Sequence, residues 1–180
     1  MNISAWLLRR AGWSVDISVP DFPKCIICVA PHTSNWDFIL GKLAYAAVGR
    51  RAGFLMKEAW FFWPLGYFFR RMGGIPVKRA GGDLVEQLTE RFRAPGALTL
   101  AITPEGTRSR TSRWRTGFLR IAYAAEVPVV LGAIDFAKKR ITIDTVFELT
   151  GDLDRDMADI KHFYKPFTGK YPEKFSTDPQ

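Results

Sequence analysis

The stretch KCIICVAPHTSNWDF, residues 24–38, decides the fold class of this chain. Residues 24–30 form a short apolar run with β-branched side chains, which is typical of a buried strand. After a short polar loop, residues 34–51 carry apolar side chains at helical spacing. In an open α/β sheet, a loop of this kind lies at the carboxyl end of a strand, where ligands usually bind.

Strands and helices alternate along most of the chain. The sequence predicts strands over residues 24–30, 53–56, 74–78, 97–103, 127–136 and 140–149, and helices over residues 1–13, 34–51, 57–72 (interrupted near Pro64), 83–92, 117–125 and 152–164. This alternation indicates a mainly parallel sheet, and the charged turn 137–139 indicates that the last two strands form an antiparallel hairpin. We therefore expect a single α/β domain over residues 1–180, with a mixed, mainly parallel sheet flanked by helices.

The composition is that of a globular protein with an unusually basic charge. The 180 residues are 47% hydrophobic and 24% charged, with a net charge of +8. These values exclude a disordered, collagen-like or coiled-coil chain, and two cysteines exclude a disulfide scaffold. Residues 1–134 contain 18 Lys and Arg against 9 Asp and Glu, a net charge of +9. A basic body predicts a polyanionic partner: nucleic acid, an anionic membrane surface or a phosphate-bearing ligand.

No segment has the pattern of a membrane span or a signal peptide. The longest uncharged run in the aromatic region, residues 59–69, would rise about 16 Å as a helix, roughly half of a bilayer core. Near the N-terminus, Arg9 and Arg10 follow the apolar stretch, and no small-residue cleavage site comes after them. We expect a cytoplasmic protein that is at most peripheral to a membrane.

His32 and Asp37 are the first candidates for chemistry. On one helix their spacing would place them about 140° apart, so they would not meet. If His32 lies in the loop and the helix begins near Ser34, Asp37 can hold one imidazole nitrogen and leave the other as a general base. The alternative is that Ser34 and Asp37 form a capping box and that His32 is an ordinary loop residue.

A second motif, TPEGTR at residues 103–108, follows another predicted strand. Gly106 allows a tight turn, and Thr107 and Arg108 beside exposed backbone N–H groups suit a phosphate. The alternative is an ordinary charged turn.

In combination, these motifs resemble the glycerolipid acyltransferase family, which includes the lysophosphatidic acid and other lysophospholipid acyltransferases. The family's first block has His, four residues and Asp, and it matches residues 31–37. Its third block, of the Pro-Glu-Gly-Thr-Arg type, matches residues 104–108. Residues 73–79 (GGIPVKR) match the second block with Pro76 at a position that is often aromatic, and residues 127–130 match the fourth block without its second proline. Order and spacing agree over about residues 25–135.

The resemblance implies a glycerol-phosphate acyltransferase-like fold and a role for each matching residue. His32 would be the general base that deprotonates an acceptor hydroxyl, and Asp37 would orient it. The hydroxyl would attack the thioester of acyl-CoA or acyl carrier protein directly, with no bound cofactor and no metal. The lysophospholipid-like acceptor would be bound by residues of the third and second blocks: Glu105, Gly106, Thr107, Arg108, Lys78 and Arg79. Backbone N–H groups near the start of the helix would stabilise the oxyanion.

The segment of residues 60–69, called the aromatic segment below, contains seven aromatic residues in ten positions. This is too many for the buried face of one helix, so we expect half of the segment to be core. The rest would contact a membrane or an acyl chain beside Arg70 and Arg71. The expected contact residues are Trp60, Phe61, Trp63 and Phe68.

An acid-free run of arginines follows the second motif. It is either a solvated face or a contact for coenzyme A phosphates, the acidic surface of an acyl carrier protein or anionic lipid headgroups. Its members are Arg108, Arg110, Arg113, Arg115 and Arg120.

Other motifs favour packing over chemistry. Cys25 and Cys28 lie in a predicted strand, where their side chains point to opposite faces, so we expect core residues rather than a redox or zinc motif. The second histidine, His162, is expected on the surface or in packing.

Two alternatives remain for the function. One is an acyltransferase acting on a non-phosphorylated lyso-lipid such as a lyso-aminolipid. The other is a non-enzymatic basic protein that binds membrane or nucleic acid, although it leaves His32 and Asp37 without a role. Because no nucleic-acid-binding signature is present, we do not expect nucleic acid as a partner.

Overall fold

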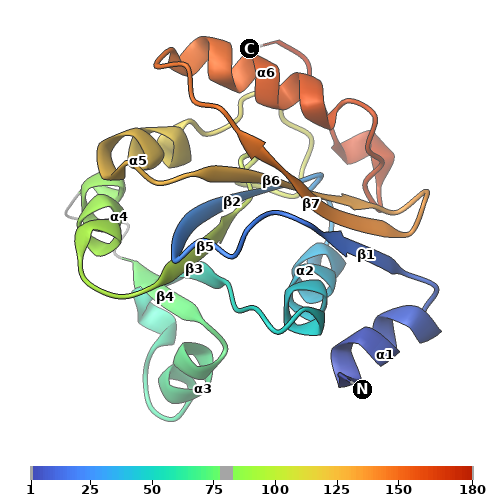
Figure 1. Ribbon diagram of the computed structural model, residues 1–180, viewed down its shortest axis with the longest axis horizontal. Helices are drawn as coiled ribbons and strands as arrows, with labels where there is room; N and C mark the ends of the chain where they lie inside the picture. The colour runs from blue at the N-terminus through green and yellow to red at the C-terminus, as the bar shows by residue number, and fades with distance from the viewer. Residues whose placement is uncertain (1, 78–82, 180) are drawn as a thin grey trace.

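The computed structural model describes residues 2–77 and 83–179 (Figure 1). In chain order the elements are α1 (Ile3–Arg10), β1 (Ser14–Ile17), β2 (Lys24–Ala30), α2 (Asn35–Ala47), β3 (Gly53–Lys57), the 3-10 turn η1 (Glu58–Trp60), α3 (Leu65–Arg71), β4 (Gly74–Val77), α4 (Leu84–Arg93), β5 (Leu98–Ile102), α5 (Gly117–Ala125), β6 (Val129–Asp135), β7 (Arg140–Phe147), α6 (Leu153–Tyr164) and the 3-10 turn η2 (Pro172–Lys174).

In the described part of the chain, seven strands form one sheet in the order β1-β7-β6-β2-β5-β3-β4. All neighbouring strands are parallel except β6 and β7, which form the expected antiparallel hairpin. The predicted fold class, a mixed and mainly parallel α/β sheet, is therefore confirmed. Strand β2 lies at the centre of the sheet between β5 and β6, so it reads as a continuous apolar run.

Helices cover both faces of the sheet (Figure 1). Helices α4, α5 and α6 lie on one side, and α1, α2 and α3 lie on the other. The side chains of β2 alternate between these layers: Ile26 and Cys28 pack with α4–α6, whereas Cys25 and Ile27 pack with Tyr45 of α2. The two cysteines are free and buried, and burial raises the pKa of both thiols. Their assignment to opposite faces of the core is confirmed.

Helix α2 begins where the sequence predicts, after Ser34, whose capping box with Asp37 is present. It ends at Ala47, four residues before the predicted end at residue 51. Gly49 has a φ of 76°, a left-handed conformation that suits glycine and turns the chain away from the helix axis.

The structure corrects the predictions at two places. Strand β1 was not expected, because its four residues carry no clear alternation and become a strand only by pairing with β7 at Arg140–Ile143. Residues 57–72 were expected to be mostly helical. They form only η1 and the short helix α3, with irregular chain around Pro64 between them.

Lys78 and Arg79, the two basic residues of the second block, lie outside the described residues. Within the described part of the chain, no helix is both long and apolar enough to cross a membrane.

Candidate active site

The two sequence motifs meet at the carboxyl edge of the sheet. Strands β2 and β5 are parallel neighbours, with Cys28 opposite Ile102. The loop after β2 carries His32, and the loop after β5 carries Glu105 and Arg108. Because parallel neighbours end at the same edge, residues about 73 positions apart in the sequence become adjacent.

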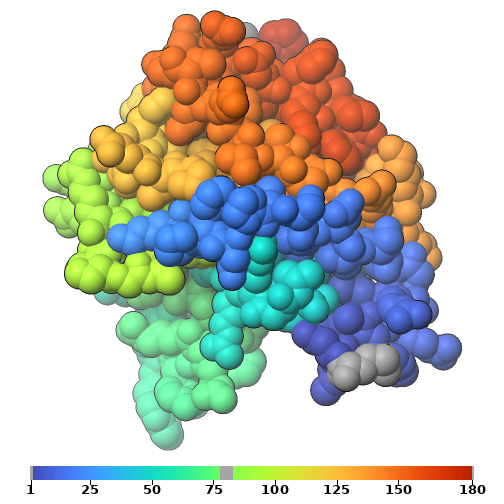
Figure 2. Space-filling model, viewed as in Figure 1, coloured from blue at the N-terminus to red at the C-terminus, as the bar shows by residue number. Residues whose placement is uncertain are grey.

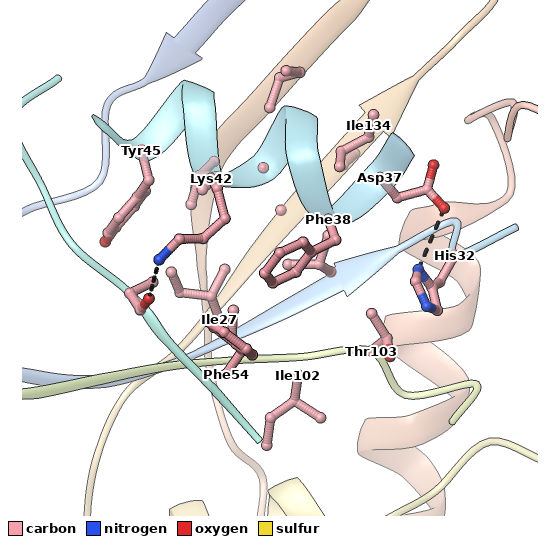
Figure 3. A pocket seen from close by; sticks show the side chains of 18 of the residues that line it. Ile27, His32, Asp37, Phe38, Lys42, Tyr45, Phe54, Ile102, Thr103 and Ile134 are labelled. Atoms are coloured by element: carbon pink, nitrogen blue, oxygen red, sulfur yellow. Dashed lines mark hydrogen bonds and ion pairs between the residues drawn. The ribbon is translucent and has the colours of Figure 1, made fainter. Parts of the chain in front are cut away.

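The His32 imidazole faces the Asp37 carboxylate, with Nδ1 lying 3.3 Å from Oδ2 (Figure 3), and among the described residues Nδ1 has no partner in hydrogen-bond geometry. The Asp37 side chain is 2% exposed, whereas that of His32 is 19% exposed. The same carboxylate accepts hydrogen bonds from the backbone N–H groups of Thr33 (2.8 Å) and Ser34 (2.7 Å) and from the Ser34 hydroxyl (2.9 Å). The capping box and the histidine–aspartate pair were alternatives in the sequence, but the structure contains both on one carboxylate.

An imidazole whose Nδ1 faces a carboxylate keeps Nε2 as the nitrogen that can accept a proton. His32 lines a cavity, so a molecule bound there would lie beside the imidazole. The arrangement is suited to general-base chemistry.

Glu105 holds the His32 loop from the other side. Its side chain is 6% exposed, and Oε1 accepts a hydrogen bond of 2.8 Å from the His32 backbone N–H. Among the described residues, Oε2 is buried without a hydrogen-bond partner. Burial raises the pKa of this carboxyl to about 7, although the bond from His32 opposes the increase. Sequence reasoning placed Glu105 with the acceptor, whereas the structure places its carboxyl against the backbone of the candidate base.

The last three residues of the TPEGTR loop, Gly106, Thr107 and Arg108, face solvent, whereas Pro104 is buried. Gly106 has a φ of 65°, and its N–H donates to Thr103 O at 3.1 Å, which closes a tight turn. The Thr107 hydroxyl accepts from the Ser109 N–H, and Arg108 is exposed and lines the cavity together with Gly106. The guanidinium and the candidate base therefore border one cavity.

That cavity has a volume of about 440 Å³ and lies between α2 and the sheet (Figure 3). It extends from His32 along α2 to Tyr45, and most of its lining is apolar, including Ile27, Phe38 and Phe54. Sequence reasoning missed these lining residues, because their apolar pattern is the same as that of core residues.

A lysine lies near the far end of the cavity. Lys42 donates from Nζ to the carbonyl oxygens of Ala52 (2.9 Å) and Met72 (2.8 Å). Burial and the neighbouring Arg51 lower the pKa of this amine. Because both hydrogen bonds reach backbone outside α2, Lys42 ties this helix to the chain around it.

The aromatic segment is more exposed than the sequence predicts. Trp60 is 52%, Trp63 88% and Phe68 56% exposed, and Phe62 and Tyr67 are exposed as well. Phe61 is half-buried: its ring packs on Phe69 at 6.2 Å between centroids and beneath the Arg70 guanidinium at 5.2 Å. Five of the seven aromatic residues therefore face solvent, so the expectation that half of the segment is core was wrong.

All five arginines of the run between residues 108 and 120 are exposed. Arg110 pairs with Asp178 at 3.1 Å.

His162, the second histidine, is exposed on α6, as expected. Within residues 2–77 and 83–179, no three His, Cys, Asp or Glu side chains are grouped as metal ligands.

The raised pKa of Glu105 predicts a pH-dependent stability. Its carboxyl binds a proton more tightly in the folded protein than in the unfolded chain, so the free energy of unfolding falls as pH rises from about 4.5 to about 7. The full loss is about 3 kcal/mol. Glu105→Gln keeps an acceptor for the His32 N–H but does not titrate, so its stability should depend less on pH. Urea denaturation of both proteins at pH 5, 6, 7 and 8 measures this difference, and equal pH dependence would contradict it.

Comparison with known proteins identifies the family. A model of the Acyltransferase family matches residues 19–134, a range that includes both loops of the site. No curated protein sequence matches this chain. Among solved structures, the crystal structure of the 1-acyl-sn-glycerophosphate (LPA) acyltransferase PlsC from Thermotoga maritima has a similar fold, with a TM-score of 0.55 and 18% identity over 91% of this chain and 78% of that chain. Since the family match covers more than half of its residues, this chain belongs to the acyltransferase family and is an acyltransferase enzyme, as its resemblance to the glycerolipid acyltransferases predicts.

Proposed function

We propose that this enzyme transfers a fatty acyl group from the thioester of acyl-CoA or acyl carrier protein to the hydroxyl of a lysophospholipid-like acceptor. The observation that carries the proposal is the His32–Asp37 pair at one end of an apolar cavity that Arg108 also borders. A base, an apolar cavity and a guanidinium match the three parts of such a reaction: a hydroxyl, an acyl chain and a phosphate.

The chemical step uses His32 as the base. Its Nε2 accepts the proton of the acceptor hydroxyl while the oxygen attacks the thioester carbon. The C–S bond then breaks, and the leaving thiolate takes the proton from the imidazolium. The carboxylate of Asp37 keeps Nδ1 oriented and stabilises the cation that forms.

The oxyanion of the tetrahedral intermediate needs hydrogen-bond donors. The N–H groups of Thr33 and Ser34 do not supply them, because both donate to Asp37. If donors near the start of α2 stabilise the oxyanion, they are therefore N–H groups other than those of Thr33 and Ser34.

The acyl chain would lie in the cavity beneath α2. Between Asp37 and Tyr45 the helix rises about 12 Å, which gives the approximate length of the apolar channel. Because the cavity begins at His32, a chain within it would place its thioester beside the base.

The acceptor would be held by the loop after β5. Arg108 would pair with the phosphate, and the turn at Gly106 and Thr107 would contribute polar groups. Lys78 and Arg79 remain proposed contributors from the second block. Glu105 would act on the reaction through the His32 backbone, which its carboxyl binds.

Reversible attachment to an anionic membrane surface would give access to such an acceptor, and we propose the cytoplasmic side. Figures 1 and 2 show α1, α2 and the aromatic segment on one side of the molecule, the side on which α2 covers the cavity, and each of the three carries exposed apolar side chains. Trp60, Trp63 and Phe68 would enter the interface beside Arg70 and Arg71. Phe61 would support them by packing on Phe69 and Arg70.

His32→Ala should lower turnover about 10²- to 10⁴-fold, because the site then lacks its base. Circular dichroism should be unchanged, since His32 is a partly exposed loop residue. The exposed His162→Ala is the matched control and should keep full activity. Near-wild-type turnover of His32→Ala in a thiol-release assay would contradict the mechanism.

Asp37→Asn should lower turnover less than His32→Ala does, but it should lower the free energy of unfolding more, because Asp37 also holds the loop backbone.

Arg108→Ala should raise the KM for a phosphate-bearing acceptor at least about tenfold, because a hydrogen bond to a charged group contributes about 1.5–3 kcal/mol. The donor KM should stay unchanged, and Arg113→Ala, at an exposed arginine of the same run, is the control for the acceptor KM. A rise in the donor KM would place Arg108 on the coenzyme A side. No change in either KM would contradict the assignment and favour a non-phosphorylated acceptor such as a lyso-aminolipid.

The protein should bind anionic vesicles more strongly than neutral ones, and salt should weaken this binding without abolishing it. Each Lys or Arg at an anionic surface contributes about 1 kcal/mol to binding, and salt screens this contribution. Salt does not screen the apolar contribution of inserted aromatic rings. Replacing Trp60 and Trp63 with Ser should remove the salt-resistant part, and Val146→Ser, at an exposed apolar residue of β7, should not. Co-sedimentation at low and high salt measures this, and equally negligible binding to both vesicles would show that the surface is not a membrane contact.

A further inference from the structure

The chain beyond α6 returns to the loop after β2, which carries His32. Within residues 168–178, called the C-terminal segment here, the Tyr171 N–H donates a hydrogen bond of 3.2 Å to Thr33 Oγ1. Thr33 follows His32 in the sequence, and its side chain is buried. The C-terminal segment, which lies outside the range that matches the family model, therefore contacts the loop one residue from the candidate base.

Gly169 packs so closely on this loop that a side chain has no room. A Cβ at Gly169 would lie 2.8 Å from both Oγ1 and Cγ2 of Thr33 and 3.2 Å from Pro31 Cβ. The φ of Gly169 lies outside the left-handed region, so its backbone conformation does not require glycine. Glycine is required at this position because the backbone approaches Thr33 so closely.

The C-terminal segment is anchored on both sides of this contact. Before it, Thr168 O accepts a hydrogen bond of 2.8 Å from the Phe136 N–H at the end of β6. After it, Ser176 O accepts a hydrogen bond of 3.1 Å from the buried Trp114 indole. Because it is fixed at both places, the segment cannot easily move away from Thr33.

A short series of contacts connects this packing to the base. The Tyr171 N–H holds the Thr33 hydroxyl, and the Thr33 N–H donates to Asp37 Oδ2 at 2.8 Å. The same oxygen lies 3.3 Å from His32 Nδ1. A displacement of Thr33 would therefore change the position of the carboxylate relative to the imidazole.

We infer that Gly169 is a positioning residue of the enzyme: because it has no side chain, the C-terminal segment approaches Thr33 closely enough for the Tyr171 N–H to bind the Thr33 hydroxyl, and the bound Thr33 fixes the geometry of the His32–Asp37 pair. The kinetic consequence rests on the proposed function, whereas the geometric one does not. The C-terminal segment is thus part of the active-site structure although it contributes no reacting group.

Gly169→Ala tests the inference by adding one methyl group where the contact distance is 2.8 Å. We expect kcat to fall about tenfold to a hundredfold, because small misplacements of reacting groups have effects of this size. The acceptor KM should change less than about twofold, since Arg108 is not touched. Gly117→Ala is the matched control, because a Cβ there would meet Val85 Cγ2 at an ordinary 3.7 Å.

A second readout does not depend on activity. The chain contains two histidines, His32 and His162, so a histidine-labelled sample gives two sets of imidazole signals in NMR. Gly169→Ala should shift the His32 signals and leave those of the exposed His162 unchanged. If the wild type transfers no acyl group, the proposed function fails, while the imidazole signals still decide this inference.

The double variant Thr33→Ala with Gly169→Ala separates a specific contact from general damage. Alanine at position 33 removes both atoms that lie 2.8 Å from the added methyl group. The double variant should therefore return to the imidazole signals and kcat of Thr33→Ala alone. Wild-type signals and kcat in Gly169→Ala, or no recovery in the double variant, would overturn the inference.

If Gly169→Ala does not fold, the variant Thr33→Val tests the inference instead. Valine keeps the volume of threonine but removes the hydroxyl that accepts the Tyr171 N–H. Shifted His32 signals and a lowered kcat with an unchanged acceptor KM would support the inference. Wild-type signals and kcat in this variant would overturn it.

Discussion

The carboxylate of Asp37 is buried in the first turn of α2, where it accepts hydrogen bonds from the Thr33 and Ser34 backbone and from the Ser34 hydroxyl, and contacts the His32 imidazole. An ionised carboxylate in a buried position is costly unless several donors satisfy it. The donors here are groups of the loop itself, so satisfying the charge also fixes the loop. Helix start, loop path and imidazole orientation therefore depend on one side chain.

The site combines this arrangement with a feature that lowers stability. Glu105 binds the His32 N–H with one oxygen and leaves the other buried without a hydrogen-bond partner among the described residues. Burial raises its pKa to about 7, so near neutral pH the carboxyl is divided between two protonation states. Shifted pKa values of this kind are frequent at functional sites, where position matters more than stability.

Exposed apolar side chains lie on the side of the sheet that contains the cavity. The exposed side chains of Trp6, Trp36, Trp60 and Trp63 lie on α1, α2 and the aromatic segment, on the side of the sheet opposite α4–α6. In the proposed function, these exposed apolar side chains form the membrane contact. Because the cavity lies under α2 on the same side, a membrane contact and an acyl chain in the cavity would share one face of the protein.

The sequence alone determined the alternation of elements and the central strand at residues 24–30, since a strand covered on both faces requires an uninterrupted apolar run. It also determined the identity of the chemical groups, because a histidine, a carboxylate and an arginine occur at fixed spacing around predicted strand ends. Only the tertiary structure decided where these groups point. Strand β1 depends on pairing with β7, the contact of Glu105 with His32 depends on the neighbouring positions of β2 and β5, and the cavity has the same apolar pattern as the core. The contact of Gly169 and Tyr171 with Thr33 joins residues more than 130 positions apart. Local sequence encodes local conformation, whereas such contacts arise only when the sheet brings distant segments together.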